Sequence, residues 1–411
     1  MWPTTRLQTL FGIEHPVVQA PMAGASTPAM AVAVANAGGL GSLGCAMMSA
    51  EQLKAAAAEV AAGTNGAVNF NFFVHEEPDL ARHDAGPMRA ALAPYYAEYG
   101  LGDPVAPEVG APAFGDAMLE VLLACAPKVA SFHFGLPKPH AVAALKAAGV
   151  KLIGNATNVA EARALGAAGM DAIVAQGAEA GGHRGAFIGA AHENDMGTMA
   201  LVPLVVDAVS IPVIAAGGIF DGRGVAAALM LGAAGAQVGS AFLRAPESSA
   251  LALHKQALAE TPDNATKLTR LFSGRPARSI RNRLVRELSA HEGEAAPFPT
   301  QRAVIAPLAK AAGARGSADF MQLWSGQAGL RAEVAPSAEI FRRICDEALE
   351  LLGPGDVLVD GGNSFYKDSV RRAATLRRSK SAWDALLKWL EEPPPGIVFI
   401  FCTTSAGERS W

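Results

Sequence analysis

Short apolar runs alternate with Ala-rich segments of helical spacing through the first 245 residues of the chain. This alternation is typical of βα units whose strands form a parallel sheet. Eight runs are present, and eight parallel strands close a barrel with every strand's C-terminal end on one face. We therefore predict an α/β fold, a (β/α)8 TIM barrel over residues 1–245. The predicted strands lie within Pro16–Met22, Gly39–Gly44, Ala67–Phe73, Val129–Gly135, Val150–Thr157, Asp171–Gly177, Pro212–Gly218 and Ala236–Phe242.

Two segments are longer than the βα repeat requires. Residues 74–127 contain several prolines and the tyrosines Tyr95, Tyr96 and Tyr99, so we expect a helical insertion beside the active face. Residues 246–335 are rich in Arg and Ala and predict a helical cap or small second domain. Substrate pockets often lie between such a cap and a barrel mouth.

Composition narrows the functional classes. The 411 residues include 34 Lys and Arg against 38 Asp and Glu, a net charge of −4 that argues against a nucleic-acid-binding surface. The most apolar long stretch, 201–220, contains Asp207 and two prolines, so we expect no membrane span. The four cysteines are dispersed and the N-terminal residues show no signal-peptide pattern, which favours a cytoplasmic protein without a disulfide framework or structural zinc site.

Glycines follow the seventh and eighth predicted strands, where barrels most often bind phosphate. Gly217 and Gly218 end the seventh strand, and Gly239 and Ser240 end the eighth. Glycines let backbone N–H groups approach a phosphate closely, and Ser240 can add a hydroxyl group. Tight βα turns would explain these glycines equally well, and only their position favours the phosphate site.

The loop after the sixth strand reads QGAEAGGHRG from Gln176 to Gly185. Gln176 can offer an acceptor and donors to a polar ring edge, and Gly181 and Gly182 let the loop fold against a ligand. The alternative is a glycine-rich loop held by an ion pair between Glu179 and Arg184.

Polar residues also end other predicted strands. His133 ends the fourth strand, where a general base or an anion-stabilising imidazole would face the barrel mouth, although a lone strand histidine is usually a core residue. Asn69 and Asn71 share one face of the third strand and need hydrogen-bond partners there, from a ligand or from neighbouring backbone. Met22, after the first strand, can supply an apolar wall.

Taken in order, these motifs resemble the nitronate monooxygenase family over about residues 6–335. The matching motifs are QAPMAG from Gln19, AGGLGSLG from Ala37, NFNFF from Asn69, SFHFG from Ser131, QGAEAGGHRG from Gln176, AAGGI from Ala215, QVGS from Gln237 and LFSGRPARSIRN from Leu271. The resemblance implies that O2 oxidises an anionic alkyl nitronate to a carbonyl compound and nitrite. It assigns His133 as the catalytic histidine and places His183 near the substrate. It implies that FMN is bound by Met22, Asn69, Gln176, Gly181, Gly218 and the loop Gln237, Val238, Gly239 and Ser240. Gly217 joins this set because of its position after the seventh strand.

Two other functions fit the same barrel. Flavin-dependent enoyl-acyl-carrier-protein reductases and NADH:quinone reductases carry a similar AGGH loop, so a reductase stays the second hypothesis. A barrel that serves only as a binding scaffold is the third. We expect no nucleic-acid or membrane partner, and the sequence does not indicate an oligomeric state.

The sequence changes character from about residue 350. LLGPGDVLVDGG from Leu351 resembles an internal piece of 6-phosphogluconate dehydrogenase, and SKSAWDALLKWL from Ser379 resembles an internal piece of the bacterial clamp-loader ATPase. Neither fragment carries its parent family's glycine-rich phosphate loop, so we expect neither activity. We predict that residues 350–411 form an atypical tail, fused or poorly ordered.

Overall fold

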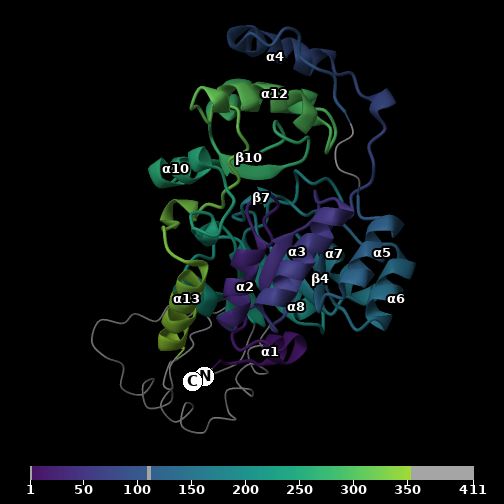
Figure 1. The fold of residues 1–411 in the computed structure, drawn as a ribbon, viewed down its shortest axis with the longest axis vertical. Helices are drawn as coiled ribbons and strands as arrows, with labels where there is room; N and C mark the ends of the chain where they lie inside the picture. Colours follow the sequence, from purple (N-terminus) through teal and green to yellow (C-terminus); the bar gives the residue numbers. More distant parts are fainter. Residues whose placement is uncertain (1, 109–112, 353–411) are drawn as a thin grey trace, which may run out of the picture. The chain divides into compact units, whose positions relative to one another are not determined.

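A computed structural model describes residues 2–108 and 113–352 of the chain. Eight strands form one all-parallel sheet in the order β1-β9-β8-β6-β5-β4-β3-β2. The Gln19 N–H donates to the Leu40 carbonyl oxygen at 3.0 Å, and a parallel bridge joins Val18 to Leu40 between β1 and β2. The sheet therefore closes into the predicted barrel (Figure 1). The strands are β1 (Val17–Gln19), β2 (Gly41–Gly44), β3 (Val68–Phe73), β4 (Val129–His133), β5 (Lys151–Ala156), β6 (Ala172–Gln176), β8 (Val213–Ala216) and β9 (Gly235–Val238).

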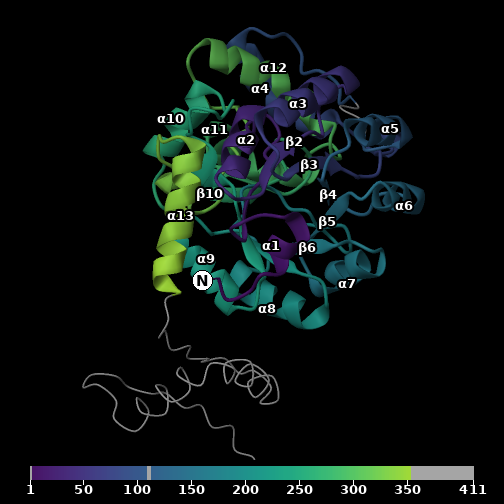
Figure 2. The same ribbon diagram turned by 60° about the horizontal axis from the view of Figure 1, so that its bottom comes forward.

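Each barrel strand is followed by a helix that covers the outside of the sheet (Figure 2). Polar side chains start several of these helices, such as Ser49, whose hydroxyl accepts from the Gln52 N–H in a reciprocal capping box. The Asp221 carboxylate likewise accepts from N–H groups at the start of α9. The helices are α2 (Pro28–Asn36), α3 (Ala50–Gly63), α5 (Asp116–Cys125), α6 (Pro139–Ala147), α7 (Val159–Ala167), α8 (Thr198–Ala208), α9 (Gly222–Met230) and α13 (Ser337–Leu351).

The N-terminal end of the barrel is closed by α1 (Arg6–Phe11). Leu7, Phe11 and Ile13 pack in one buried cluster with barrel residues such as Val18 and Ile214. Apolar side chains therefore fill this end, which leaves the opposite, C-terminal end of the strands for ligands.

The cap combines helices with a small sheet. Residues 246–335, expected to be helical, also contain β10 (Thr266–Thr269) and β11 (Ala277–Ile280), and β11 pairs with β7 (Gly182–His183) from the loop after the sixth barrel strand. The sheet ties that loop to the cap. The cap helices are α10 (Ala252–Glu260), α11 (Arg283–Leu288) and α12 (Gln301–Ala314), with 3-10 turns η3 (Ser289–Glu294) and η4 (Gly329–Arg331). The turn η2 (Ser240–Phe242) lies before the cap, in the loop after β9.

The insertion at 74–127 is divided between the two parts of the fold. After the turn η1 (Leu80–Arg82), α4 (Gly86–Tyr99) packs in the cap, where the Tyr96 hydroxyl donates to the Val304 carbonyl oxygen of α12 at 2.7 Å. Tyr95 and Tyr99 contact Phe320 edge-on. The tyrosine cluster is thus part of the cap core, whereas α5 is an ordinary barrel helix.

The eighth barrel helix lies far beyond the predicted barrel boundary at residue 245. Helix α13 packs against α9 and α2, and it buries Ile340, Phe341 and Ile344. Because residues 243–336 are inserted between β9 and this helix, periodicity alone did not connect the two. The barrel therefore needs the chain to continue to Leu351.

We expect a chain that ends at residue 352 to keep the stability of the longer protein. Contacts divide the chain after Leu351, and α13 completes the barrel at that point. The melting temperature should stay within ~2 °C, since every core side chain of the described residues is kept. A much lower melting temperature of the shortened chain would show that the barrel depends on later residues.

The prediction of an atypical tail lies, from residue 353 onward, outside the described residues. In the ranges that the structure describes, every helix is too short or too polar to cross a membrane.

Candidate active site

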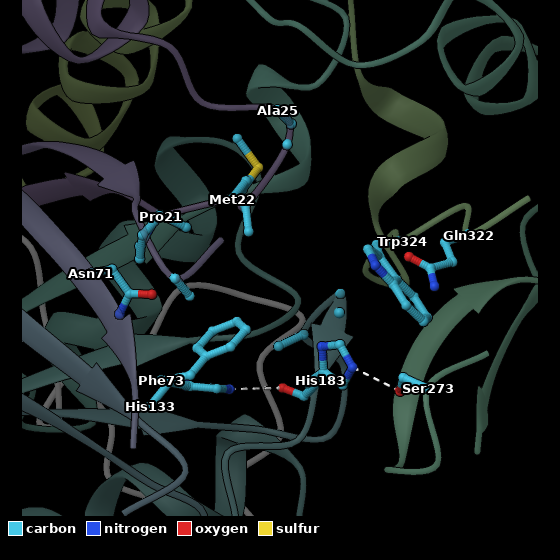
Figure 3. Close-up of a pocket in the computed structure, with 18 of the residues that line it drawn as sticks. Pro21, Met22, Ala25, Asn71, Phe73, His133, His183, Ser273, Gln322 and Trp324 are labelled. Atoms are coloured by element: carbon cyan, nitrogen blue, oxygen red, sulfur yellow. Dashed lines mark hydrogen bonds between the residues drawn. The ribbon is translucent and has the colours of Figure 1, made fainter. Parts of the chain in front are cut away.

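A cavity of about 890 Å³ lies between the C-terminal mouth of the barrel and the cap. Strand ends line one side, and Ser273, Phe298, Arg302 and Trp324 line it from the cap. The volume falls in the range of small-molecule and cofactor sites. Figure 3 shows His133 and His183 on one wall of this cavity, with Met22 and Trp324 on others.

The two glycine loops meet on one side of the cavity because β8 and β9 are hydrogen-bonded neighbours. Gly217 and Gly218 have φ values of 112° and 72°, and the Thr198 hydroxyl lies 2.8 Å from the Gly217 carbonyl oxygen at their turn. The N–H groups of Gly217, Gly218 and Gly239 donate to no atom in the described ranges. Open donors at a cavity wall are the requirement of a phosphate site.

Arg184 does not pair with Glu179, contrary to the alternative considered above for this loop. The Arg184 side chain is completely buried, and its guanidinium donates to the carbonyl oxygens of Gln176 and Gly177, each at 2.7 Å. The Glu179 carboxylate instead accepts from the Thr198 N–H and hydroxyl at 2.9 Å. Both charged groups hold backbone, so the loop is rigidly placed against the cavity.

Gln176 connects the loop to the cavity wall that carries His133 and His183. Its amide oxygen accepts from the Gly185 N–H at 2.8 Å, and its amide nitrogen donates to the His183 carbonyl oxygen at 2.9 Å. Gly185 must be glycine here, because a Cβ atom would lie 2.7 Å from Cε1 of His133. Gln176 therefore positions the loop as well as lining the cavity.

The protonation of the His133 ring follows from its hydrogen bond. Its Nε2 lies 3.2 Å from the His183 carbonyl oxygen, which can only accept, so Nε2 carries the hydrogen (Figure 3). Nδ1 is then an unprotonated acceptor, and it has no partner among the described residues. The sequence left two roles for His133, and this arrangement favours the proton acceptor over the anion stabiliser.

His133 and His183 are both neutral at physiological pH. Burial lowers the pKa of His133 to about 3, and the positive charge of Arg275 contributes to the shift. Burial and the proximity of His133 lower the pKa of His183 to about 3 as well. The imidazoles therefore supply no positive charge to an anionic substrate.

Arg275 supplies that charge instead. Its guanidinium lies 4.4 Å from the centroid of the Phe134 ring and donates to the carbonyl oxygens of Arg184 and Ala186. No carboxylate of the described chain lies within 4 Å of it. Burial lowers the pKa of Arg275 to about 10, so it stays protonated at neutral pH. Its positive charge contributes to the lowered pKa values of His133 and His183.

His183 lies against the cap. Its Nε2 is 2.8 Å from the Ser273 hydroxyl, and its ring is 5.1 Å from the Trp324 ring and 5.3 Å from the Phe298 ring, centroid to centroid. The aromatic rings shield this part of the cavity from water.

Most predicted site residues line the cavity together, but Asn69 and Val238 do not. Asn69 is one repeat deeper in β3, where its amide donates to the Ser42 hydroxyl at 3.2 Å, and Asn71 reaches the cavity in its place. Val238 is completely buried, because strand alternation turns it away from the face of Gln237 and Gly239. The predicted residues on the cavity wall are Met22, His133, Gln176, Gly181, His183, Gly217, Gly218, Gln237, Gly239 and Ser240.

The cap contributes residues that the sequence analysis did not assign. Ser273, Phe298 and Trp324 line the cavity from irregular segments, and Arg302 lines it from α12. Arg275 does not line the cavity, but its charge acts on His133 and His183. The motif LFSGRPARSIRN contains Ser273 and Arg275, and it was the one signal in the sequence that pointed to this part of the cap.

These residues fit the flavin that the sequence resemblance implies. Unpaired N–H groups of Gly218 and Gly239 suit a phosphate, and Met22 provides an apolar surface beside them. Asn71 has a free amide oxygen at the cavity, because its nitrogen donates to the Ser131 hydroxyl at 2.9 Å. Such polar groups suit the edge of a flavin ring.

Comparison with known proteins identifies the family. A family model described as nitronate monooxygenase matches residues 4–347. A probable nitronate monooxygenase of Staphylococcus aureus (strain Newman) is 40% identical over 353 residues, which cover 86% of this chain and 99% of the relative.

Solved structures of similar fold support the same family. A nitroalkane oxidase from Streptomyces ansochromogenes has a TM-score of 0.77 and 39% identity, covering 84% of this chain and 98% of that one. FabK from Thermotoga maritima has a TM-score of 0.65 and 30% identity, covering 84% and 96%. The chain therefore belongs to the nitronate monooxygenase family and is a flavin-dependent oxidoreductase.

Proposed function

We propose that this enzyme uses FMN to oxidise alkyl nitronates with O2. In net terms two nitronates and one O2 give two carbonyl compounds and two nitrite ions. Each carbon–nitrogen bond breaks, each carbon gains one of the two oxygen atoms of O2, and each nitrogen leaves as nitrite. No nicotinamide is consumed. The observation that carries the proposal is the positive charge of Arg275, which acts on the neutral histidines His133 and His183 of the cavity. A positive charge near the cavity suits a substrate that arrives as an anion.

FMN is the flavin that the cavity suits best. The open N–H groups of Gly217, Gly218 and Gly239 form a single cradle, which matches one terminal phosphate. Asn71, Gln176 and Gly181 would contact the ring and its chain, and Asn71 replaces the predicted Asn69. When bound, the flavin accepts electrons from the substrate and passes them to O2.

The protein's own groups orient the substrate and control its proton. Arg275 attracts the anion, while Phe298 and Trp324 exclude water near His183. Nδ1 of His133 can accept a proton from a neutral nitroalkane, but its low pKa makes it a weak base. A nitronate has already lost that proton. The site therefore favours nitronates, and we expect neutral nitroalkanes to react more slowly.

We expect the purified protein to release nitrite in air from the nitronate of 1-nitropropane without NADH. Freshly dissolved 1-nitropropane at the same pH should react at least about tenfold more slowly, since a general base of low pKa contributes little. Nitrite formation and O2 consumption measure both rates. The reductase hypothesis would replace this proposal if the nitronate were inert while NADH reduced the flavin rapidly.

A further inference from the structure

One buried carboxylate outside the cavity has no part in the chemistry described so far. Glu161 lies on α7, in the layer of helices around the barrel, and its side chain is completely buried. It does not line the cavity. A buried carboxylate is costly unless donors satisfy its oxygen atoms, so the groups that bind Glu161 indicate what it holds in place.

Four donors satisfy the Glu161 carboxylate. Its Oε2 atom accepts from the Thr157 N–H at 2.6 Å and from the Thr157 hydroxyl at 2.8 Å, in the turn before α7. Its Oε1 atom accepts from the N–H groups of Phe187 and Ile188 at 2.6 and 3.0 Å. The other hydrogen bond of these two residues in the described ranges, from the Asn158 amide to the Ile188 carbonyl oxygen, is long at 3.4 Å. Glu161 is therefore the main anchor of the backbone at residues 187 and 188.

The segment of residues 183–188, which Glu161 anchors at its far end, carries the main contacts of the proposed active site. The Nε2 atom of His133 lies 3.2 Å from the carbonyl oxygen of its first residue. Arg275 donates to the carbonyl oxygens of its second and fourth residues. The third residue, Gly185, packs so closely that a Cβ atom there would lie 2.7 Å from Cε1 of His133. A small shift of this segment would therefore move both the imidazole and the guanidinium.

The charge of Glu161 and its hydrogen bonds have opposite consequences for an anionic substrate. Burial lowers the pKa of Arg275 to about 10, and the negative charge of Glu161 opposes that shift, so the two charges attract each other. The same negative charge, considered alone, repels an anion in the cavity. If charge dominated, removing Glu161 would strengthen anion binding, whereas loss of the anchored segment would weaken it. An experiment can therefore separate the two effects.

We propose that Glu161 is a positioning residue, which fixes residues 183–188 so that Arg275 and the His133 ring stay in the places that the nitronate requires. This inference rests on the proposed function. Glu161 acts through the two backbone N–H groups at the end of the segment and does not contact the substrate. Charge-assisted hydrogen bonds from backbone N–H groups to a buried carboxylate are strong enough for this role.

The test compares two substitutions of Glu161 in the full-length, flavin-loaded enzyme. Glu161→Gln removes the charge and sets an NH2 group against N–H or O–H donors, whereas Glu161→Asp keeps the charge but is one methylene group shorter. Both should raise KM for the nitronate of 1-nitropropane by about tenfold or more. The Kd for FMN should change by less than about threefold, because the glycine cradle lies on the loops after β8 and β9. Nitrite release measures KM, and titration of the apoprotein measures the Kd.

Glu247→Gln is the matched control. The Glu247 carboxylate accepts from the Ser337 N–H at 3.1 Å and from the Ser337 hydroxyl at 3.0 Å, at the start of α13, and it does not line the cavity. Its replacement removes a comparable set of hydrogen bonds far along the chain from residues 183–188. We expect a lower melting temperature and a KM within about twofold of the wild type. A KM raised as much as in Glu161→Gln would make general loss of stability the explanation and overturn the proposal.

An unchanged or lower KM in Glu161→Gln, or a wild-type KM in Glu161→Asp, would also overturn it. If neither variant folds, Thr157→Val decides the question, because it removes one of the four donors with little change in shape. We then expect KM to rise about threefold, and an unchanged KM would refute the anchor.

A wild type that oxidised no nitronate would end the proposed function separately. Nitrate, a planar anion of similar shape to the nitronate group, would then test Glu161 without turnover. Its Kd, measured from the absorption of the bound flavin, should rise about tenfold in both Glu161 variants and stay unchanged in Glu247→Gln. A nitrate Kd that is unchanged or lower in Glu161→Gln would contradict the positioning role.

Discussion

Gly218→Val is expected to yield a folded protein that retains almost no flavin. Gly218 has φ 72°, a conformation that a β-branched residue adopts only with strain, and this turn directs the open N–H groups toward the cavity. A valine Cβ would also lie 3.4 Å from Cβ of Glu179, whose carboxylate fixes Thr198. Loss of the aligned donors should raise the Kd for FMN by about 10²-fold or more. Flavin absorbance after purification and titration of the apoprotein measure this change.

Gly149→Val is the matched control. Gly149 has φ 80°, no neighbouring atom lies within 4 Å of the position that a Cβ atom would take, and the residue does not line the cavity. It therefore carries the same backbone strain, about 1–2 kcal/mol, without touching the site. We expect Gly149→Val to stay fully flavinated at a slightly lower melting temperature. Equal flavin loss in both variants would mean that strain, and not the cradle, explains the result.

His133→Asn is expected to slow the oxidation of neutral nitroalkanes much more than the oxidation of nitronates. If Nδ1 accepts a proton, the variant should lose about 10²-fold or more in kcat for neutral nitroalkanes. Nitronates have no proton to give up, so their oxidation should fall by less than about tenfold. In the wild type, the nitronate rate should show no titration of this histidine between about pH 5 and 8, because its pKa of about 3 lies below that interval.

His133→Gln tests the alternative that the ring only supports the loop. A glutamine amide can reach the position of Nε2 and keep a donor for the His183 carbonyl oxygen, but it offers no imidazole base. We expect it to keep bound flavin and to be as poor as His133→Asn with nitroalkanes. Recovery of nitroalkane turnover in His133→Gln would assign His133 a positioning role instead.

The sequence pattern predicted the barrel well because each strand is a continuous apolar run with a clear end. Seven of the eight predicted runs contain a whole barrel strand, and the eighth contains all of β9 except Gly235. The loops after β8 and β9 meet as expected. The pattern failed at α13 because nearly a hundred residues separate this helix from its strand. It also missed the cap sheet, since β7 is only two residues long and pairs with β11 across a large sequence separation.

The sequence predicted the site residues that directly follow a strand end. It could not predict how deep a residue lies along its strand or which groups the cap buries. Asn69 and Asn71 share a face, so alternation could not tell which one reaches the cavity. The neutral state of His133 and His183 depends on burial beneath the cap and on Arg275, which is distant in sequence and adjacent only in the fold. No local pattern contains that information.

The absorption spectrum of the flavin, followed without O2, tests the central claim most directly. We predict that adding the nitronate of 1-nitropropane alone bleaches the flavin band, that readmitting air restores it, and that nitrite accumulates. NADH should have little effect on the same sample. A flavin band unchanged by nitronate but bleached rapidly by NADH would contradict the account.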